Sequence, residues 1–234
     1  MPELAAVLLD VDGTLLDSND AHARAWVEAL REQGVFASTE RIRWLIGMGG
    51  DKILPQVAQV EADSDLGQRI NTRRREIFLQ HHLMDCRPFR GARALLLRLR
   101  DDGRRCVITS SAQPPELGPL LQQAGIADLI DKTAQAAESK PDPDIVCAAL
   151  RRAGVAPDQA IMLGDTPYDV EAALGAGVST IALRCGGWDE DSLQGACAIF
   201  ADPADLLKHY ARSPLGLAAD PLGRQERRRN QRRH

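Results

Sequence analysis

The chain has 234 residues, of which 44% are apolar and 26% are charged, and its net charge is -4. This size and composition indicate a globular chain with a sizeable core, and the small net charge argues against a nucleic acid or a membrane surface as principal partner. The five cysteines are scattered and form no Cys-x-x-Cys pair, which argues against a disulfide framework or a zinc site.

The localisation expected from the sequence is cytoplasmic. Scattered, unpaired thiols are typical of a reducing compartment. The first residues lack the basic segment and long apolar run of a signal peptide, and no stretch of about eighteen apolar residues predicts a membrane-spanning helix.

Four short apolar runs bounded by turn residues predict buried strands, at residues 5–9, 106–108, 160–163 and 180–183. Continuous apolar strands suit a sheet that is covered on both faces. Strands that alternate with helix-like sequence indicate parallel strands joined by crossover helices. The expected fold class is therefore α/β with a parallel sheet.

The interval between the first two predicted strands, about ninety-five residues, is too long for one crossover. Amphipathic patterns predict helices at 21–33, 41–46, 51–60 and 66–82, and a further helix at 92–102 that leads back to the sheet. An inserted helical domain over 19–86 is the simplest account, with a return hinge at 87–91. The core would then consist of residues 1–18 and 87–211.

The C-terminal segment 212–234 is predicted to be a disordered basic tail. From Arg224 to His234 it carries six arginines and one glutamate and little that could pack in a core. Such a segment can neutralise nucleic-acid phosphates without sequence preference, but it has no aromatic residue for base stacking. Nucleic acid is therefore expected as a partner only through non-specific contact by this tail.

The strongest chemical signal follows the first predicted strand, where the chain reads Asp10-Val11-Asp12-Gly13-Thr14-Leu15. Ligands of open parallel sheets bind beyond the carboxyl ends of the strands, so Asp10 and Asp12 can face one crevice. Two close carboxylates repel each other unless a cation lies between them, and Mg²⁺ prefers such oxygen ligands.

This run has two simpler interpretations. A calcium loop of the EF-hand type begins similarly but needs Asp or Asn at its fifth position and Gly at its sixth, where this chain has Thr14 and Leu15. A plain acidic turn after a strand is the other alternative.

One further strand end and one lysine add groups that can bind phosphate. Ser110 offers a hydroxyl and Ser111 a backbone N–H, although such residues also serve as turn or cap residues. Lys140 is one of only four lysines beside twenty-five arginines. Its compact ammonium suits a bridge between a carboxylate and a phosphate, and the alternative is a solvated lysine before a helix.

An acidic pair follows the third predicted strand. Asp165 lies at the strand end and Asp169 four residues later, so both could complete a magnesium site. The alternative is that Asp169 caps the next helix.

This set and order of motifs resembles the haloacid dehalogenase superfamily, in its phosphatase and phosphomutase branch, over residues 5 to about 210. The resemblance implies a Rossmann-like core and a mobile helical cap of type 1, formed by the insert. The matching residues, in motif order, are Asp10 with Asp12, Ser110, Lys140, and Asp165 with Asp169.

The resemblance implies a phosphatase in which Asp10 is the nucleophile and Asp12 the general acid and base. Ser110, Ser111 and Lys140 would bind the phosphoryl group. The second aspartate of the first motif favours phosphate esters over haloacids or phosphonates as substrates.

The cofactor implied by the resemblance is Mg²⁺. Its ligands would be the Asp10 carboxylate, the backbone carbonyl of Asp12 and the Asp165 carboxylate. Asp169 would bind the ion directly or through water.

A sugar phosphomutase similar to β-phosphoglucomutase is the main alternative. His22 matches the hinge histidine of such enzymes, and the loop from Gly47 to Lys52 lies where they hold a second phosphate. Gly50 appears where they carry an arginine, although Lys52 offers another positive charge. His22, Gly47 and Lys52 are therefore candidate substrate residues.

A non-catalytic protein, or one acting on nucleic acid through its tail, is an alternative of a different class. The complete set of motifs argues against a non-catalytic domain. The substrate is expected to be a small phosphorylated metabolite, and a sugar phosphate, phosphoglycolate and a nucleoside monophosphate all fit. The oligomeric state is left open.

Overall fold

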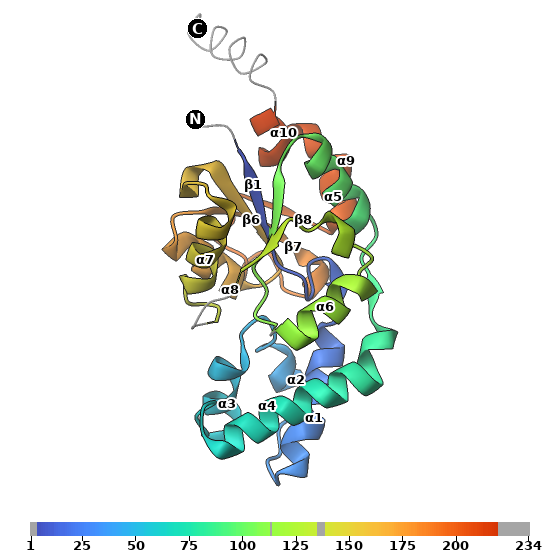
Figure 1. Cartoon of the computed structure of the whole chain (residues 1–234), viewed down its shortest axis with the longest axis vertical. Helices are drawn as coiled ribbons and strands as arrows, with labels where there is room; N and C mark the ends of the chain where they lie inside the picture. Colours follow the sequence, from blue (N-terminus) through green and yellow to red (C-terminus); the bar gives the residue numbers. More distant parts are fainter. Residues whose placement is uncertain (1–3, 113, 135–138, 220–234) are drawn as a thin grey trace, which may run out of the picture.

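The computed structural model describes residues 4–112, 114–134 and 139–219. Its centre is a six-stranded parallel sheet with the strand order β5-β4-β1-β6-β7-β8 (Figure 1). The strands are β1 (Ala6–Leu9), β4 (Arg105–Ile108), β5 (Lys132–Thr133), β6 (Ala160–Gly164), β7 (Ser179–Leu183) and β8 (Ala198–Phe200). The predicted α/β class is confirmed, and the four predicted strands are present with ends shifted by at most one residue.

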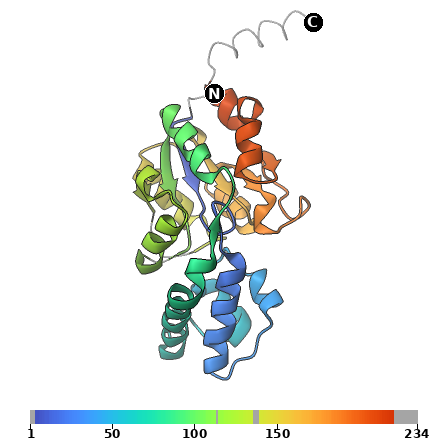
Figure 2. The ribbon, with the colours of Figure 1, turned by 90° about the vertical axis from the view of Figure 1, so that its right-hand side faces the viewer.

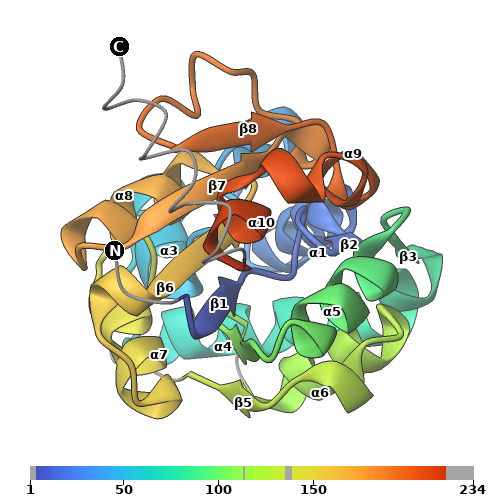
Figure 3. The same ribbon diagram turned by 90° about the horizontal axis from the view of Figure 1, so that it is seen from above.

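Helices cover both faces of the sheet, as Figure 3 shows from above. One face carries α7 (Asp144–Ala153) and α8 (Pro167–Gly175), which share a hydrophobic cluster with Leu8 of β1. The other face is covered by α5 (Ala92–Asp101), α6 (Pro114–Gln123), α9 (Pro203–Lys208) and α10 (Pro214–Ala219). Because alternate residues of a strand point to opposite faces, Leu9 packs on this second side. Burial on both faces explains the continuous apolar runs.

Residues 19–85, which lie between β1 and α5, form a separate group of helices below the sheet (Figures 1 and 2). Its helices are α1 (Asn19–Glu32), α2 (Thr39–Arg43), α3 (Gly50–Ala58) and α4 (Asp65–Ile77). A π-helical turn at Phe78–His82 extends α4. Trp26, Leu30, Ile70 and Phe78 are among its fully or nearly fully buried side chains, so the group has an apolar interior.

The helical group joins the sheet through two adjacent chain segments. Here β2 (Leu16–Asp17) pairs antiparallel with β3 (Arg87–Pro88). Gly91, in the return segment, has a φ of +82°, and a Cβ there would lie 2.7 Å from the backbone of Ala204. Only glycine suits this position, because the conformation is left-handed and the approach is close.

The prediction of disorder from residue 212 is wrong for 212–219, where the chain forms α10. Leu215 of this helix is fully buried, and its backbone carbonyl accepts a hydrogen bond from the buried guanidinium of Arg104. The arginine-rich part of the predicted tail, 220–234, lies outside the described residues. Among the residues that are described, no helix is both long and apolar enough to cross a membrane.

Candidate active site

The parallel sheet brings three motif segments to one edge. The backbone N–H of Asp10 donates to Leu163 of β6 at 2.9 Å, and the N–H of Thr109 donates to Leu9 of β1 at 2.8 Å. The ends of β1, β4 and β6 therefore lie side by side. Their order in the sheet places Asp10 between the segments that carry Ser110 and Asp165.

Asp10 is the centre of this group and is only 3% exposed. Its Oδ1 accepts a hydrogen bond from Lys140 Nζ, and its Oδ2 lies 3.1 Å from the hydroxyl of Thr14. That hydroxyl is also 2.8 Å from Oδ1 of Asp165. Thr14 therefore links two carboxylates that come from different strands.

Lys140 is completely buried and neutralises two acidic groups. Besides Asp10, it forms an ion pair with Oδ1 of Asp169 at 2.6 Å. A buried charge is tolerated only when it is paired in this way. The alternative of a solvated lysine is therefore excluded.

Asp169 serves the N-terminus of α8 as well as Lys140. Thr166 caps this helix, and Asp169 Oδ2 accepts from the Thr166 backbone N–H at 3.0 Å and from its hydroxyl at 2.8 Å. This reciprocal arrangement is a capping box. The helix-capping alternative for Asp169 thus holds, and both of its oxygens already have partners.

The carboxylates of Asp10, Asp165 and Asp169 offer oxygens that all lie within 4.8 Å of one another. Burial raises the pKa of Asp10 to about 7, with Asp169 and Asp12 adding to the rise and Lys140 opposing it. Burial likewise raises the pKa of Asp165 well above its usual range, with further repulsion from Asp10. Three buried acids beside one lysine are left with an excess of negative charge, so this oxygen cluster fits a hard divalent cation.

Asp12 is oriented differently from Asp10 and lies on the side of the helical group. Its Oδ1 accepts a hydrogen bond from the Ser18 hydroxyl at 2.5 Å and lies 2.9 Å from Nε2 of His22. Burial by itself would raise the pKa of Asp12, but the charge and hydrogen bond of His22, the hydrogen bond from Ser18 and the charge of Lys140 together lower the pKa below its ordinary value. His22 is itself held by stacking on Phe78, with ring centroids 3.9 Å apart.

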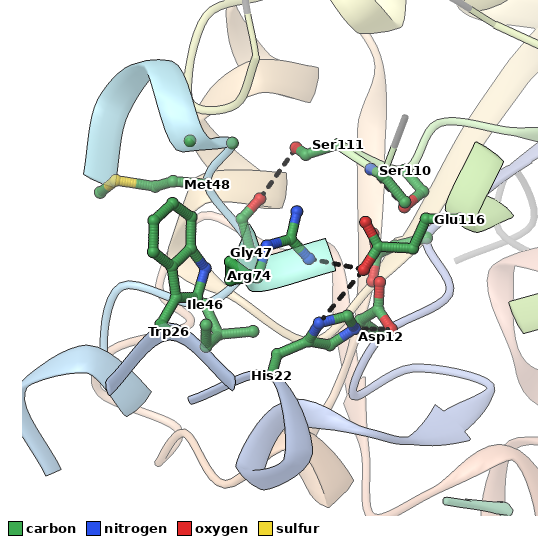
Figure 4. Close-up of a pocket in the computed structure, with 14 residues that line it drawn as sticks. Asp12, His22, Trp26, Ile46, Gly47, Met48, Arg74, Ser110, Ser111 and Glu116 are labelled. Atoms are coloured by element: carbon green, nitrogen blue, oxygen red, sulfur yellow. Dashed lines mark hydrogen bonds and ion pairs between the residues drawn. The ribbon is translucent and has the colours of Figure 1, made fainter. Parts of the chain in front are cut away.

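A pocket opens between the sheet edge and the helical group (Figure 4). Its lining joins Asp10 and Asp12 to residues of α1, α4 and the loop before α3. The lining residues are Asp10, Asp12, His22, Trp26, Ile46, Gly47, Met48, Gly49, Gly50, Arg74, Ser110, Ser111, Ala112 and Glu116.

The structure brings most of the predicted substrate residues to this pocket. His22, Gly47, Ser110 and Ser111 line it, and the Ser111 hydroxyl donates to the Gly47 carbonyl at 3.1 Å. Lys52 is not part of the described lining, and its Nζ lies 3.6 Å from Asp51. A substrate contact by Lys52 stays a prediction.

Four residues of the site were not singled out from the sequence. Thr14 lies within the first motif, so its position next to Asp10 and Asp12 could have indicated that it belongs to the site. Asn19, which donates to Asp165 at 3.2 Å, comes from the start of the insert. Arg74 and Glu116 meet only in the folded chain, because α4 and α6 are far apart in the sequence.

Comparisons with known proteins agree with this geometry. A phosphoglycolate phosphatase of Rhodospirillum rubrum is 32% identical over 216 residues, which cover 86% of this chain and 88% of that protein. An N-acetylmuramic acid 6-phosphate phosphatase of Pseudomonas putida is 26% identical, with coverage of 88% and 95%. The crystal structure of a hydrolase from Pseudomonas syringae superimposes with a TM-score of 0.82 at 28% identity, covering 89% of this chain and 98% of that one.

The family model for haloacid dehalogenase-like hydrolases matches residues 7–183, which include every motif residue described above. Together with the curated relatives, it supports the hydrolysis of phosphoric monoesters as the class of reaction. This chain belongs to the haloacid dehalogenase-like hydrolases.

Proposed function

We propose that this protein is a magnesium-dependent phosphatase that hydrolyses the phosphate ester of a small alcohol through an aspartyl-phosphate. The observation that carries the proposal is the placement of Asp10. Its carboxylate lies at the end of β1, contacts Lys140 and Thr14, and lines the pocket together with Asp12.

In the first step, a carboxylate oxygen of Asp10 attacks phosphorus and the bond to the alcohol oxygen breaks. Asp12 gives a proton to that oxygen; because its contacts in the free site favour its ionised form, it must gain this proton when the substrate binds. In the second step, water attacks the phosphorus of the aspartyl-phosphate and Asp12 takes a proton from it. Inorganic phosphate leaves and Asp10 is regenerated, so the reaction is divided into two easier steps.

Charge on the phosphoryl oxygens needs stabilisation throughout. Lys140 contacts the nucleophile directly, and Ser110 lies at the adjoining strand end. Mg²⁺ would be held by the carboxylates of Asp10 and Asp165 and by the backbone carbonyl of Asp12. The ion would supply positive charge next to the phosphoryl group.

The helical group of residues 19–86 is proposed to act as a cap over the site, with 1–18 and 87–211 as the catalytic core. Its loop already touches the core at two points. The backbone N–H of Gly49 donates to Ser139 Oγ at 3.0 Å, and Ser139 Oγ donates to Asp51 at 2.6 Å. A cap in this position excludes water from the aspartyl-phosphate.

A phosphomutase needs a group in the cap that binds the second phosphate of its bisphosphate intermediate. At Gly50, the position considered for such an arginine, an added Cβ would lie 2.1 Å from the side chain of Asn71. A longer side chain here would require the Asn71 side chain to move, and the chain has no arginine at this position. This observation favours hydrolysis over isomerisation.

The proposal is tested by measuring phosphate release from a panel of phosphorylated metabolites with and without Mg²⁺. The panel includes phosphoglycolate and N-acetylmuramic acid 6-phosphate, the substrates named for the relatives. β-Glucose 1-phosphate with its bisphosphate activator tests for isomerisation in parallel. Release that requires Mg²⁺ and is abolished in Asp10→Asn supports the proposal.

Reduction with borohydride during turnover tests the intermediate separately, since it converts an aspartyl-phosphate into homoserine. Homoserine at position 10 is expected from the wild-type protein. Full turnover by a folded Asp10→Asn protein would exclude Asp10 as nucleophile.

A further inference from the structure

The pocket contains a carboxylate that the proposed reaction does not use. Glu116 of α6 is completely buried and lines the pocket opposite the cap. Its Oε1 accepts from Arg74 at 2.5 Å and lies 3.6 Å from Nδ1 of His22. Its second oxygen, Oε2, has no hydrogen-bond partner among the described residues.

Arg74 presents the complementary atom. Its side chain is 13% exposed, and its guanidinium lies over the Trp26 ring, 5.3 Å from the centroid. Its Nε–H, also buried, lacks a partner within the described part of the chain. Figure 4 shows the Arg74 guanidinium joined to the Glu116 carboxylate by a dashed line, with His22 and Asp12 beside them.

An unpaired acceptor and an unpaired donor in one buried place are costly unless a ligand satisfies them. A hydroxyl group matches both atoms, because it donates one hydrogen bond and accepts others. A carboxylate matches only the donor. It cannot donate to Glu116 Oε2, and it would bring a third negative charge close to Glu116 and Asp12.

Resting on the proposed phosphatase function, the geometry points to a polyhydroxylated substrate class, the monophosphates of sugars or sugar alcohols. A hydroxyl of the leaving alcohol donates to Glu116 Oε2, and that hydroxyl or its neighbour accepts from Arg74 Nε–H. Arg74 does not serve as a receptor for an anionic leaving group, because Glu116 already pairs with its charge. Selectivity arises because a substrate without a suitable hydroxyl leaves Glu116 Oε2 or Arg74 Nε–H without a hydrogen bond.

Two matched substrate pairs test this assignment. 2-Hydroxyethyl phosphate differs from phosphoglycolate, and glycerol 1-phosphate from 3-phosphoglycerate, only by a hydroxymethyl group in place of a carboxylate. We expect kcat/KM of the wild-type protein to favour the hydroxyl member by on the order of tenfold or more, the effect of one hydrogen bond to a charged group. Equal rates, or preference for the carboxylate member in both pairs, would overturn the inference.

The role of Glu116 is tested with Glu116→Gln, which keeps the size of the side chain. Its amide can donate to a carboxylate, so the preference for the hydroxyl member should fall about tenfold or reverse. The matched control is Glu32→Gln, because Glu32 of α1 forms an exposed ion pair with Arg73 of α4, the residue next to Arg74. An unchanged preference in a folded Glu116→Gln protein would contradict the assignment.

Failure of the proposed reaction is separated from failure of this inference by two further measurements. Hydrolysis of p-nitrophenyl phosphate reports the phosphatase chemistry alone, because its leaving group carries neither the hydroxymethyl group nor the carboxylate of the matched pairs. Calorimetric binding of the same pairs to Asp10→Asn reports selectivity without turnover. Selective binding of the hydroxyl members without any hydrolysis would uphold the pocket assignment and reject the phosphatase.

Discussion

Lys140 shows what one residue contributes in this site. It is completely buried and pairs with both Asp10 and Asp169, so it compensates two carboxylates that are buried or almost completely buried. Removing one partner of a buried ion pair leaves an uncompensated charge, which is far more costly than losing an exposed pair. The lysine therefore supports folding in addition to its proposed role in phosphate binding.

We expect Lys140→Met to lower the free energy of unfolding by about 3–5 kcal/mol and to abolish phosphate release. Urea denaturation in EDTA and in Mg²⁺ measures the first effect, and Mg²⁺ should recover part of the lost stability because it neutralises the same carboxylates. Lys208→Met, at an exposed position, is the control. A metal-free variant as stable as the wild type would show that Lys140 does not compensate these acids.

At the scale of elements, α10 closes the core at a place where the sequence predicted disorder. Arg104 precedes β4 and is buried, and its guanidinium donates to the hydroxyl of Tyr210 at 3.0 Å and to the carbonyl of Leu215. The helix thus satisfies a buried cation that is more than a hundred residues away in the chain. Its apolar residue Leu215 adds to the same core.

Deleting residues 213–234 is expected to cost on the order of 3 kcal/mol of stability, the sum of one buried leucine and one charged hydrogen bond. Deleting only 220–234 retains every contact described for α10 and is the matched control. Thermal unfolding of the two truncated proteins measures the difference. Equal melting temperatures would mean that α10 contributes nothing to the core.

At the scale of the whole molecule, the buried acids proposed for catalysis lower the free energy of unfolding when they ionise. Asp10 has a pKa of about 7 in the folded chain, mainly because of burial, against an ordinary value of 3.8. Between these values the folded state binds more protons than the unfolded state, so its stability falls as pH rises. Mg²⁺ favours the ionised acids and opposes this fall.

We therefore expect the metal-free protein to lose stability, relative to Asp10→Asn, as pH rises from about 4 to about 7. Denaturant titrations of both proteins in EDTA across this range measure the difference. With Mg²⁺ present, the difference should shrink or reverse. Parallel stability curves in EDTA would show that Asp10 ionises in the folded chain as it does in the unfolded one.

The sequence was informative wherever the physics is local. Continuous apolar runs predicted four buried strands, because both faces of a parallel sheet must be covered. Polar residues at the ends of those strands predicted that Asp10, Ser110 and Asp165 lie together, since neighbouring parallel strands end at one edge. The sequence did not predict the short edge strands β5 and β8, because two or three residues are too few to show a continuous apolar run.

The sequence by itself determined the fold class of this protein and the groups proposed to react, since those depend on periodicity and on position relative to strand ends. The tertiary structure alone decided the shape and polarity of the substrate pocket. Arg74 of α4 and Glu116 of α6 are 42 residues apart in the sequence. Neither belongs to a local sequence motif that would indicate a binding site. Only the packing of the helical group on the sheet buries them together and leaves one donor and one acceptor for the substrate.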